Sequence, residues 1–435
     1  MSLPIVVSII SFLIFVTILA TPKLPNALVF FLVGPLVVFT GTMKASDVFG
    51  VMASSSLFLM MIIGFFSHLM KISTLDMSIG TIVNNLTKKA KGKHQETYVF
   101  FIIFVVGALF STVLQNVSVA MAMLPALFGI ARTTGISRSK MVLFIIYATT
   151  LGGAVTLIGT PTNVFASGAL EAAGIQPFGM LDFAWVALPI AILGGAYMIL
   201  MHNRCASYDD TDSGDLEVLS EVTDPVRANR QKSWVSATFG AFVMALVVNS
   251  LWPNIGAYFN PYMVGFFGIG VMFLFKVFTW DEIMDGFPYR NVLFTAGILL
   301  VIRIVSGTGL GAVFGDAVVR IIGDSTNLYF ITSVLFIGAA IVTQFMNNMA
   351  TAGALAPIGI SIAEAMGADP RAIVMAIAIG AGCGYLTPMA SGTNQTLIAF
   401  SELQIQDFVK FGWPLVVISF ICCVLILPQV FPFFP

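Results

Sequence analysis

The chain has 435 residues, of which 58% are hydrophobic and 9% are charged, and its mean hydropathy is +0.97. A soluble domain carries about 25% charged residues, so this composition excludes a soluble globular protein and predicts an integral membrane protein. The net charge of −1 predicts no nucleic-acid surface. The four cysteines show no spacing typical of a disulfide framework or a metal cluster.

A spanning helix needs about 20 mostly apolar residues, and we predict about ten such crossings. In chain order they cover 3–21, 26–42, 55–69, 142–166, 183–201, 234–252, 262–278, 292–310, 372–398 and 413–431. No Lys or Arg precedes the first apolar run, so we expect a retained helix rather than a cleaved signal peptide. Two further stretches, 98–132 and 328–366, are too long for one crossing and have polar residues in the middle. We predict that each is a re-entrant hairpin.

The predicted domains are N-terminal scaffold helices over 1–54, a first repeat over 55–202, and a second half over 234–435. Apolar residues at helical spacing within 73–95, followed by four lysines, predict an amphipathic helix on the cytoplasmic surface. Acidic residues crowd the stretch 203–233, which predicts a solvated cytoplasmic linker.

The positive-inside rule orients these crossings. With the N-terminus outside, sixteen of the twenty Lys and Arg residues fall on the cytoplasmic side. Full crossings in place of the two hairpins would spoil this asymmetry. We therefore expect a multi-pass protein of the cytoplasmic (inner or plasma) membrane, surrounded by the lipid bilayer, with both termini outside.

The two halves of the chain share landmarks in the same order. Asn116 and Pro125 recur as Asn348 and Pro357 at an offset of 232, and the motif 159–163 recurs as 390–394 at an offset of 231. Asp182 and Asp407, each followed by a proline, form a later pair near span ends, where we expect capping or anchoring. The assigned topology inverts one copy relative to the other. Such repeats typify carriers that expose one site to either side of a membrane.

The predicted fold is an all-α polytopic membrane protein with inverted repeats, two re-entrant hairpins and broken helices at the membrane midplane. Broken backbone at membrane depth persists only where protein or a watery cavity covers it. The breaks expose N–H groups that attract anions, and oxygens that replace the water shell of Na⁺. Candidate residues at the hairpin tips are Ser111, Gln115, Asn116, Ser118, Thr343, Asn347, Asn348 and Thr351. Asn163 and Asn394 lie in the following crossings. The neighbouring pairs Gly152-Gly153 and Gly382/Gly384 are expected to allow close packing.

None of these motifs contains a titratable side chain, which favours coupling to Na⁺ over coupling to protons. Arg303 is the one basic residue predicted within a span. It either attracts the anion, pairs with a carbonyl or reaches toward the membrane interface. The predicted spans supply no convincing nucleophile–base pair, metal cluster or pair of buried acids, so we expect no enzyme and no organic cofactor.

The Asn-bearing hairpin motif, the run Thr156-Leu157-Ile158-Gly159-Thr160-Pro161-Thr162-Asn163 and their second copies resemble the divalent-anion:sodium symporters of the ion transporter superfamily. The resemblance implies a homodimer of protomers with a scaffold and a transport domain that moves like an elevator. It assigns Asn116 and Asn348 to both the substrate carboxylate and Na⁺. It implies that the cation sites are lined by Ser111, Gln115 and Gly159 and by Thr343, Asn347 and Ala390. It places Thr162, Asn163, Thr393 and Asn394 beside the anion.

The family pattern at each hairpin tip is Ser-Asn-Thr, whereas the triplets here are Gln115-Asn116-Val117 and Asn347-Asn348-Met349. Val117 and Met349 give a less polar pocket, and Ser118 and Thr351 are candidates for displaced hydroxyls. The main hypothesis is a sodium-coupled importer of a small di- or tricarboxylate. The alternatives are a sulfate or other oxyanion carrier, a cation/proton antiporter, and, from other classes, an anion channel or a membrane sensor.

Overall fold

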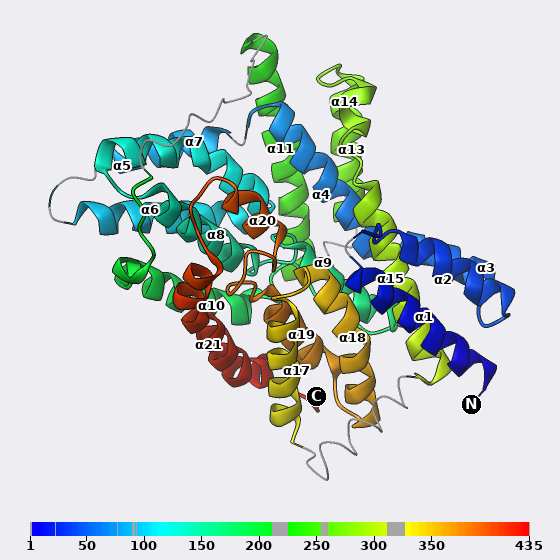
Figure 1. Cartoon of the computed structure of the whole chain (residues 1–435). Coiled ribbons are helices and arrows are strands. Elements are labelled where there is room, and N and C mark those ends of the chain that lie inside the picture. Colours follow the sequence, from blue (N-terminus) through cyan, green and yellow to red (C-terminus); the bar gives the residue numbers. More distant parts are fainter. Residues whose placement is uncertain are drawn as a thin grey trace.

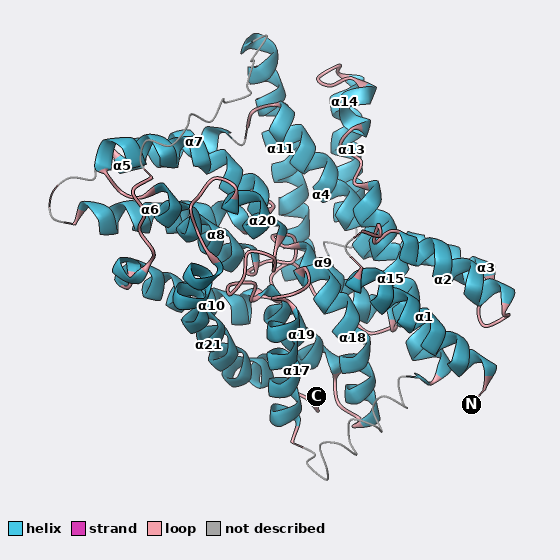
Figure 2. Ribbon diagram, in the orientation of Figure 1, coloured by secondary structure: helices cyan, strands magenta, loops and turns pink. Residues whose placement is uncertain are grey.

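The computed structural model describes residues 2–21, 23–75, 77–88, 92, 94–210, 225–252, 254, 260–310 and 327–434, and within these residues every regular element is a helix. The first six elements are α1 (Leu3–Ala20), α2 (Leu28–Phe39), α3 (Ala45–Gly50), η1 (Val51–Ala53), α4 (Ser55–Ile72) and α5 (Met77–Thr87). Figure 2 shows an entirely helical molecule joined by loops. The predicted all-α fold class is confirmed.

Two sets of five helices follow one another in the same order. The first set is α6 (Gln95–Ser111), α7 (Asn116–Thr134), α8 (Arg138–Gly153), α9 (Pro161–Ala172) and α10 (Ala184–Leu200). The second set is α17 (Leu328–Val342), α18 (Asn348–Ala365), α19 (Pro370–Gly382), α20 (Gly392–Ile398) and α21 (Ile405–Val430). Each set contains a helical hairpin, a helix broken into two, and a closing helix.

Between the two sets lie η2 (His202–Arg204), α11 (Pro225–Leu251), α13 (Pro261–Leu274), α14 (Trp280–Met284) and α15 (Tyr289–Thr308). Figure 1 shows the hairpins α6–α7 and α17–α18 reaching the middle of the molecule from different directions, so that their turns and the two helix breaks meet there. The turns occupy 112–115 and 343–347, and the breaks occupy 154–160 and 383–391.

The broken helices form the core of the molecule. Every residue of α8 is buried, and so is every residue of α19 from Ala372 to Ala381. A helix that is buried on every side has no solvent-facing surface and lies inside the protein. Glycines allow the close approach: a Cβ on Gly152 would lie 2.1 Å from Ala108 O of α6. This packing holds the ends of α8 and α19 firmly beside the hairpin turns.

The helices are interrupted where broken helices were predicted. Among the described residues five helical stretches are long and apolar enough to cross a membrane: α4, α7, α11, the 280–308 stretch and α21. Seven shorter apolar helices accompany them. Two predicted crossings, 142–166 and 372–398, are each divided into two helices, because Gly, Pro and Thr residues interrupt the helical hydrogen bonds there.

Both described ends of the acidic linker predicted over 203–233 are structured. Its end is helical, since α11 begins at Pro225, and its start is packed against the protein. Asp210 is 4% exposed, because its carboxylate accepts hydrogen bonds from Arg138 N (2.9 Å) and Ser139 N (2.8 Å) at the start of α8. The other acidic residues from 211 to 224 lie outside the described residues.

The amphipathic helix predicted within 73–95 corresponds to α5. It packs against α7 rather than standing alone, and a Cβ on Gly80 would lie 2.7 Å from Ala122 O. Three of the four lysines that follow it, Lys89, Lys91 and Lys93, lie outside the described residues.

Candidate functional site

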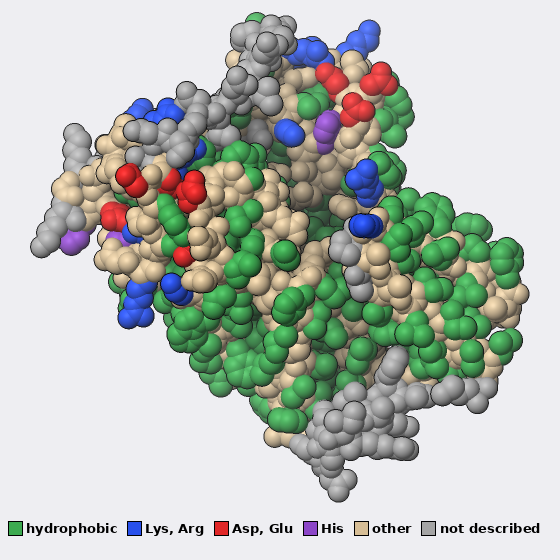
Figure 3. Space-filling model, in the orientation of Figure 1, with side chains coloured by type: hydrophobic (Ala, Val, Ile, Leu, Met, Phe, Trp, Pro, Cys, Tyr) green, Lys and Arg blue, Asp and Glu red, His purple; other side chains and the backbone are tan. Residues whose placement is uncertain are grey.

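A cavity of about 280 Å³ lies where the hairpin turns and the helix breaks meet. Four triplets and one further residue line it: Gln115, Asn116 and Val117; Thr160, Pro161 and Thr162; Asn347, Asn348 and Met349; Ser391, Gly392 and Thr393; and Asn291. None of these side chains is charged. The face in Figure 3 is hollowed near its centre, with basic residues along one side of the hollow.

Four helices begin at this cavity. Helix α7 starts at Asn116, α18 at Asn348, α9 at Pro161 and the short α20 at Gly392. The first N–H groups of a helix have no partner within the helix, and the aligned peptide dipoles give that end a partial positive charge. Because four such ends converge, the cavity favours a negatively charged ligand although no basic side chain lines it.

A cluster of oxygens lies beside the first hairpin turn. The amide end of Asn116 lies 2.6 Å from Ser111 Oγ, 3.2 Å from Thr149 O and 3.2 Å from Gly159 O. These carbonyls come from the last turn of α8 and from the break that follows it. The Asn116 amide packs directly on Gly153, because a Cβ at that position would lie 2.2 Å from Asn116 Oδ1.

The second hairpin repeats this cluster. The amide end of Asn348 lies 2.8 Å from Thr343 Oγ1, 3.0 Å from Ala381 O and 2.7 Å from Ala390 O. Relative to the first cluster, these positions are offset by 231 or 232 residues. The internal repeat of the sequence is therefore also a repeat of atomic arrangement.

Each cluster offers two ways to satisfy its oxygens. With the amide NH₂ group turned toward them, Asn116 and Asn348 donate to the surrounding carbonyls and hydroxyls. With the amide oxygen turned toward them, Asn116 Oδ1 accepts from Ser111 Oγ (2.6 Å) and Asn348 Oδ1 from Thr343 Oγ1 (2.8 Å). The neighbouring carbonyl oxygens then lack the amide donor and are free to bind a cation. Neutral hydroxyl, amide and carbonyl oxygens are the ligands of hard cations. Since no carboxylate takes part, the donor set fits a monovalent ion such as Na⁺.

Asn163 and Asn394 brace the helix breaks rather than lining the cavity. The amide nitrogen of Asn163 donates to Ala154 O (3.0 Å) and Thr156 O (2.8 Å). That of Asn394 donates to Gly384 O (2.8 Å) and Thr387 O (2.9 Å). Both asparagines therefore satisfy backbone carbonyls that the breaks leave without a helical partner. Their neighbours Thr162 and Thr393 are the residues of these motifs that line the cavity.

The two candidate displaced hydroxyls also point elsewhere. Ser118 Oγ lies 3.3 Å from Ser67 Oγ of α4, and Thr351 Oγ1 donates to Asn347 O (3.2 Å). Neither residue lines the cavity, so Val117 and Met349 leave its walls without those hydroxyls.

Gln115 and Asn347 face the cavity rather than the oxygen clusters, and Asn347 Oδ1 accepts from Ala350 N (2.8 Å) as the cap of α18. Arg303 lies away from the cavity and donates to Asp47 O (3.2 Å). Asp182 and Asp407 accept hydrogen bonds from backbone N–H groups of Gly179 and Gln404, both at 2.8 Å, as anchors of loops that precede a helix.

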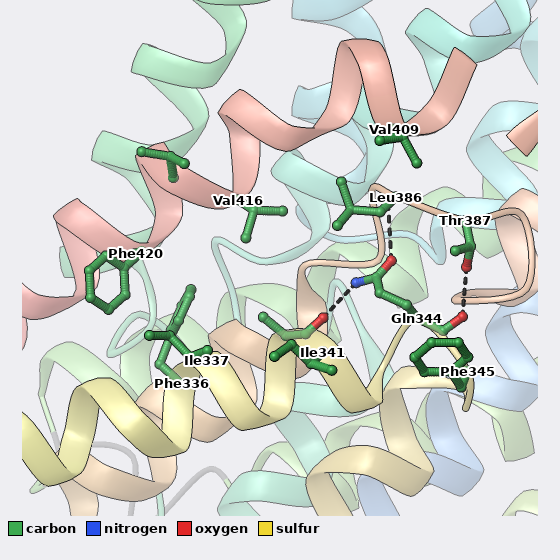
Figure 4. A pocket seen from close by; sticks show the side chains of 12 residues that line it. Phe336, Ile337, Ile341, Gln344, Phe345, Leu386, Thr387, Val409, Val416 and Phe420 are labelled. Carbon is green, nitrogen blue, oxygen red and sulfur yellow. Dashed lines mark hydrogen bonds between the residues drawn. The ribbon is translucent and has the colours of Figure 1, made fainter. Parts of the chain in front are cut away.

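Hydrogen bonds from residues outside the predicted site set connect the hairpin turns to the helix breaks. Figure 4 shows Gln344 of the second turn, whose amide nitrogen donates to Ala340 O (2.7 Å) and whose Oε1 accepts from Leu386 N (3.0 Å). The same nitrogen also donates to Cys383 O (2.8 Å). Thr387 Oγ1 donates to Gln344 O (2.7 Å). In the first repeat Thr156 Oγ1 donates to Thr112 O. These bonds fix the distance between turn and break, which sets the size of each cluster.

Comparison with known proteins gives a consistent picture. The model of a family described as CitMHS, citrate transporter, matches residues 12–378. An uncharacterized transporter of Haemophilus influenzae is 25% identical over 377 residues, covering 82% of this chain and 76% of that protein. The sodium-dependent dicarboxylate transporter SdcS of Staphylococcus aureus is 23% identical over 313 residues, covering 67% of this chain and 59% of that protein.

A solved structure has a similar fold. The YdaH transporter of Alcanivorax borkumensis matches with a TM-score of 0.62 at 13% sequence identity, over 91% of this chain and 88% of that one. At this identity the similarity concerns the fold alone.

Proposed function

We propose, from the premise that this chain belongs to the CitMHS citrate transporter family, that it is a sodium-coupled symporter of small di- or tricarboxylates. It is a transporter rather than an enzyme, as the family and the matched relatives are. The proposal concerns the substrate and the coupling ion.

The observation that supports it is the opposite polarity of neighbouring helix ends. Four helix N-termini face the cavity, where they favour an anion, while the C-terminal carbonyls of α8 and α19 face the two oxygen clusters, where they favour cations. Asn116 and Asn348 touch both regions. A cation in each cluster would turn the amide oxygen inward and leave the amide NH₂ group for the substrate, which links the two binding events.

Sodium is favoured over protons by the chemistry of the donors. Coupling to protons usually needs an intramembrane side chain that titrates, and the described residues that form the cavity and the clusters include no Asp, Glu, His, Lys or Arg. The matched relatives described as sodium-dependent dicarboxylate transporters agree with this assignment.

The carboxylate substrate is favoured by the pseudo-symmetry of the cavity. Each repeat contributes one hairpin tip and one break, so the cavity has two equivalent sets of donors. A molecule with a carboxylate at each end matches two such sets. A single tetrahedral oxyanion has only one centre of charge.

Transport requires that the site reach either side of the membrane. We propose an elevator-like movement of the hairpins and broken helices against the helices around α4 and α15, in a homodimer, as the sequence resemblance implies. The charge asymmetry of the loops supports a cytoplasmic-membrane location with both termini outside.

Thermal unfolding of the purified protein tests the proposed ligands. Succinate, malate, citrate, aspartate, sulfate and phosphate are compared in Na⁺ and in choline. A ligand that binds only the folded state stabilises it, by about 2.7 kcal/mol at a hundred times its dissociation constant. We expect stabilisation by a di- or tricarboxylate only with Na⁺. Stabilisation by sulfate or phosphate alone would make the chain an oxyanion carrier, and a response to pH without any response to Na⁺ would favour an antiporter.

A further inference from the structure

One residue of the cavity wall comes from outside the repeat motifs. Twelve of the thirteen lining residues belong to the hairpin tips and the helix breaks, whereas Asn291 is the third residue of α15. The position 232 residues earlier is Leu59, which is buried in α4 and does not line the cavity. Asn291 therefore breaks the two-fold pattern of the site.

Helix α15, which carries Asn291, packs against α2 and α4. A Cβ on Gly297 of α15 would lie 2.8 Å from Phe30 N of α2, so these two helices touch along their backbones. Just before α15, Pro288 packs so tightly on α4 that a Cβ on Gly64 would lie 2.4 Å from Pro288 Cγ. The backbone carbonyl of Asn291 accepts from Thr295 Oγ1 (2.7 Å). Helix α15 also packs on α18, where a Cβ on Gly353 would lie 2.8 Å from Ile298 Cδ1. Contacts with helices inside and outside the repeats therefore fix the position of Asn291.

The side chain of Asn291 is available to a ligand. It is exposed, and its amide makes no hydrogen bond within the described residues. The other asparagines of the cavity are engaged: Asn116 and Asn348 with the oxygen clusters, and Asn347 with Ala350 N. A primary amide offers two donors and an acceptor, so Asn291 presents unused hydrogen-bonding capacity to the cavity.

We propose that Asn291 hydrogen-bonds a third oxygen-bearing group of the substrate, a carboxylate or hydroxyl that lies between its two terminal carboxylates. The inference rests on the proposed function. The two repeats supply equivalent donors for the two terminal carboxylates of the substrate. Asn291 has no equivalent in the other repeat, so it suits a central group that occurs once in the substrate. Asn291 thereby sets the preference for tricarboxylates and hydroxy-substituted dicarboxylates over unsubstituted dicarboxylates.

Binding of citrate and succinate to the full-length protein in Na⁺, measured by calorimetry, tests this role. Loss of a hydrogen bond to a charged group corresponds to roughly a tenfold change in affinity. We expect Asn291→Ala to weaken citrate binding by about tenfold and succinate binding by less than about twofold. Asn291→Asp, which has the same size but repels an anion, weakens citrate binding further. The control Asn229→Ala removes an exposed amide of α11 outside the cavity and leaves both affinities unchanged.

Two results would overturn the role of Asn291: equal weakening of citrate and succinate in Asn291→Ala, or no change in either. An unchanged unfolding temperature without ligand shows that the variant is folded. If the unsubstituted protein binds neither anion in Na⁺, the proposed function itself is wrong. If it binds both and the ratio of the two affinities does not respond to Asn291, only this inference is wrong.

Discussion

The side-chain amides of Asn116 and Asn348 each lie within 3.2 Å of three oxygens. Gly153 and Gly384, which lack a side chain, leave space for these amides. Gly153 has Asn116 Oδ1 at 2.2 Å from the position of an added Cβ, and Gly384 has Asn348 Oδ1 at 3.2 Å. Both glycines were expected to serve packing. Gly153 packs against the amide of Asn116 and Gly384 against the amide of Asn348, and each amide is part of a proposed cation site.

The first prediction follows from this contact. Gly153→Ala forces the Asn116 amide away from Ser111 Oγ and Gly159 O, so we expect the apparent affinity for Na⁺ to fall by about tenfold or more, the equivalent of one lost ligand. The measurement is anion binding titrated with Na⁺. Gly384→Ala has more room and should lower the Na⁺ affinity less. Equal effects of the two variants would contradict this explanation.

The second prediction concerns the hydroxyls that the hairpin tips lack. Val117 and Met349 line the cavity at positions where the symporter pattern has threonine. Val117→Thr adds a donor beside the substrate carboxylate, and we expect it to strengthen succinate binding by about tenfold, as a hydrogen bond to a charged group does. Ser118→Ala, which removes a hydroxyl outside the cavity, should leave the affinity unchanged. Weaker binding in Val117→Thr would show that the substrate contacts this wall through apolar groups.

At the scale of single residues, the sequence predicted which residues meet at the cavity better than it predicted how their side chains are oriented. Repeat-matched polarity identified Asn116 and Asn348, and the family resemblance added Thr162 and Thr393; the structure brings all four to one cavity. The same signal also selected Asn163 and Asn394, whose amides face the protein backbone. It missed Thr149 and Ala381, because they contribute backbone carbonyls, which every residue has. It missed Asn291 because that residue lies outside the repeat.

Helix α8 begins in a polar network that lies outside the proposed site. The Asp210 carboxylate accepts from two backbone N–H groups at the start of the helix and from the hydroxyls of Ser137 and Ser139. Ser139 Oγ also accepts from Glu402 N (2.7 Å), which precedes α21. Tyr208 donates to the Asp407 carboxylate (2.6 Å), and this bond raises the pKa of Tyr208 to about 12. The residues after α10 therefore join the two repeats.

The third prediction tests this junction. Asp210→Ala leaves buried N–H and O–H groups without an acceptor, and we expect it to lower the free energy of unfolding by about 2 kcal/mol. Asp210→Asn, which keeps an acceptor, should cost less. Asp209→Ala is the control, because Asp209 is exposed. Thermal unfolding in detergent measures the three variants, and an Asp210→Ala protein as stable as the control would contradict the capping role.

The fourth prediction concerns His202 in η2. Burial lowers the pKa of His202 below its ordinary value, although Glu96 acts in the opposite direction. The folded protein therefore binds fewer protons at this side chain than the unfolded chain does, so its stability falls as the pH drops below about 6.5. One proton contributes at most about 1.4 kcal/mol per pH unit. We expect His202→Gln to flatten the pH dependence of the unfolding temperature between about pH 6.5 and 5. An unchanged slope would show that His202 does not titrate differently in the two states.

At the scale of the whole molecule, apolar length, the internal repeat and the positions of polar interruptions were enough to predict the hairpins and the breaks. The turns at 112–115 and 343–347 lie inside the stretches expected to be re-entrant. The start of the linker could not be predicted, because a buried Asp210 depends on a distant helix start that supplies its donors. The acidic composition of a segment does not show which distant backbone N–H groups bind its carboxylates.

The central claim is that one Na⁺-loaded anion site alternates between the two sides of the membrane. Uptake of a labelled di- or tricarboxylate into proteoliposomes, driven by an inward Na⁺ gradient or by a pH gradient in Na⁺-free buffer, tests it most directly. We predict saturable, Na⁺-dependent uptake that Asn116→Ala and Asn348→Ala abolish. Equally fast uptake under the pH gradient without Na⁺, or uptake that does not saturate, would contradict the account.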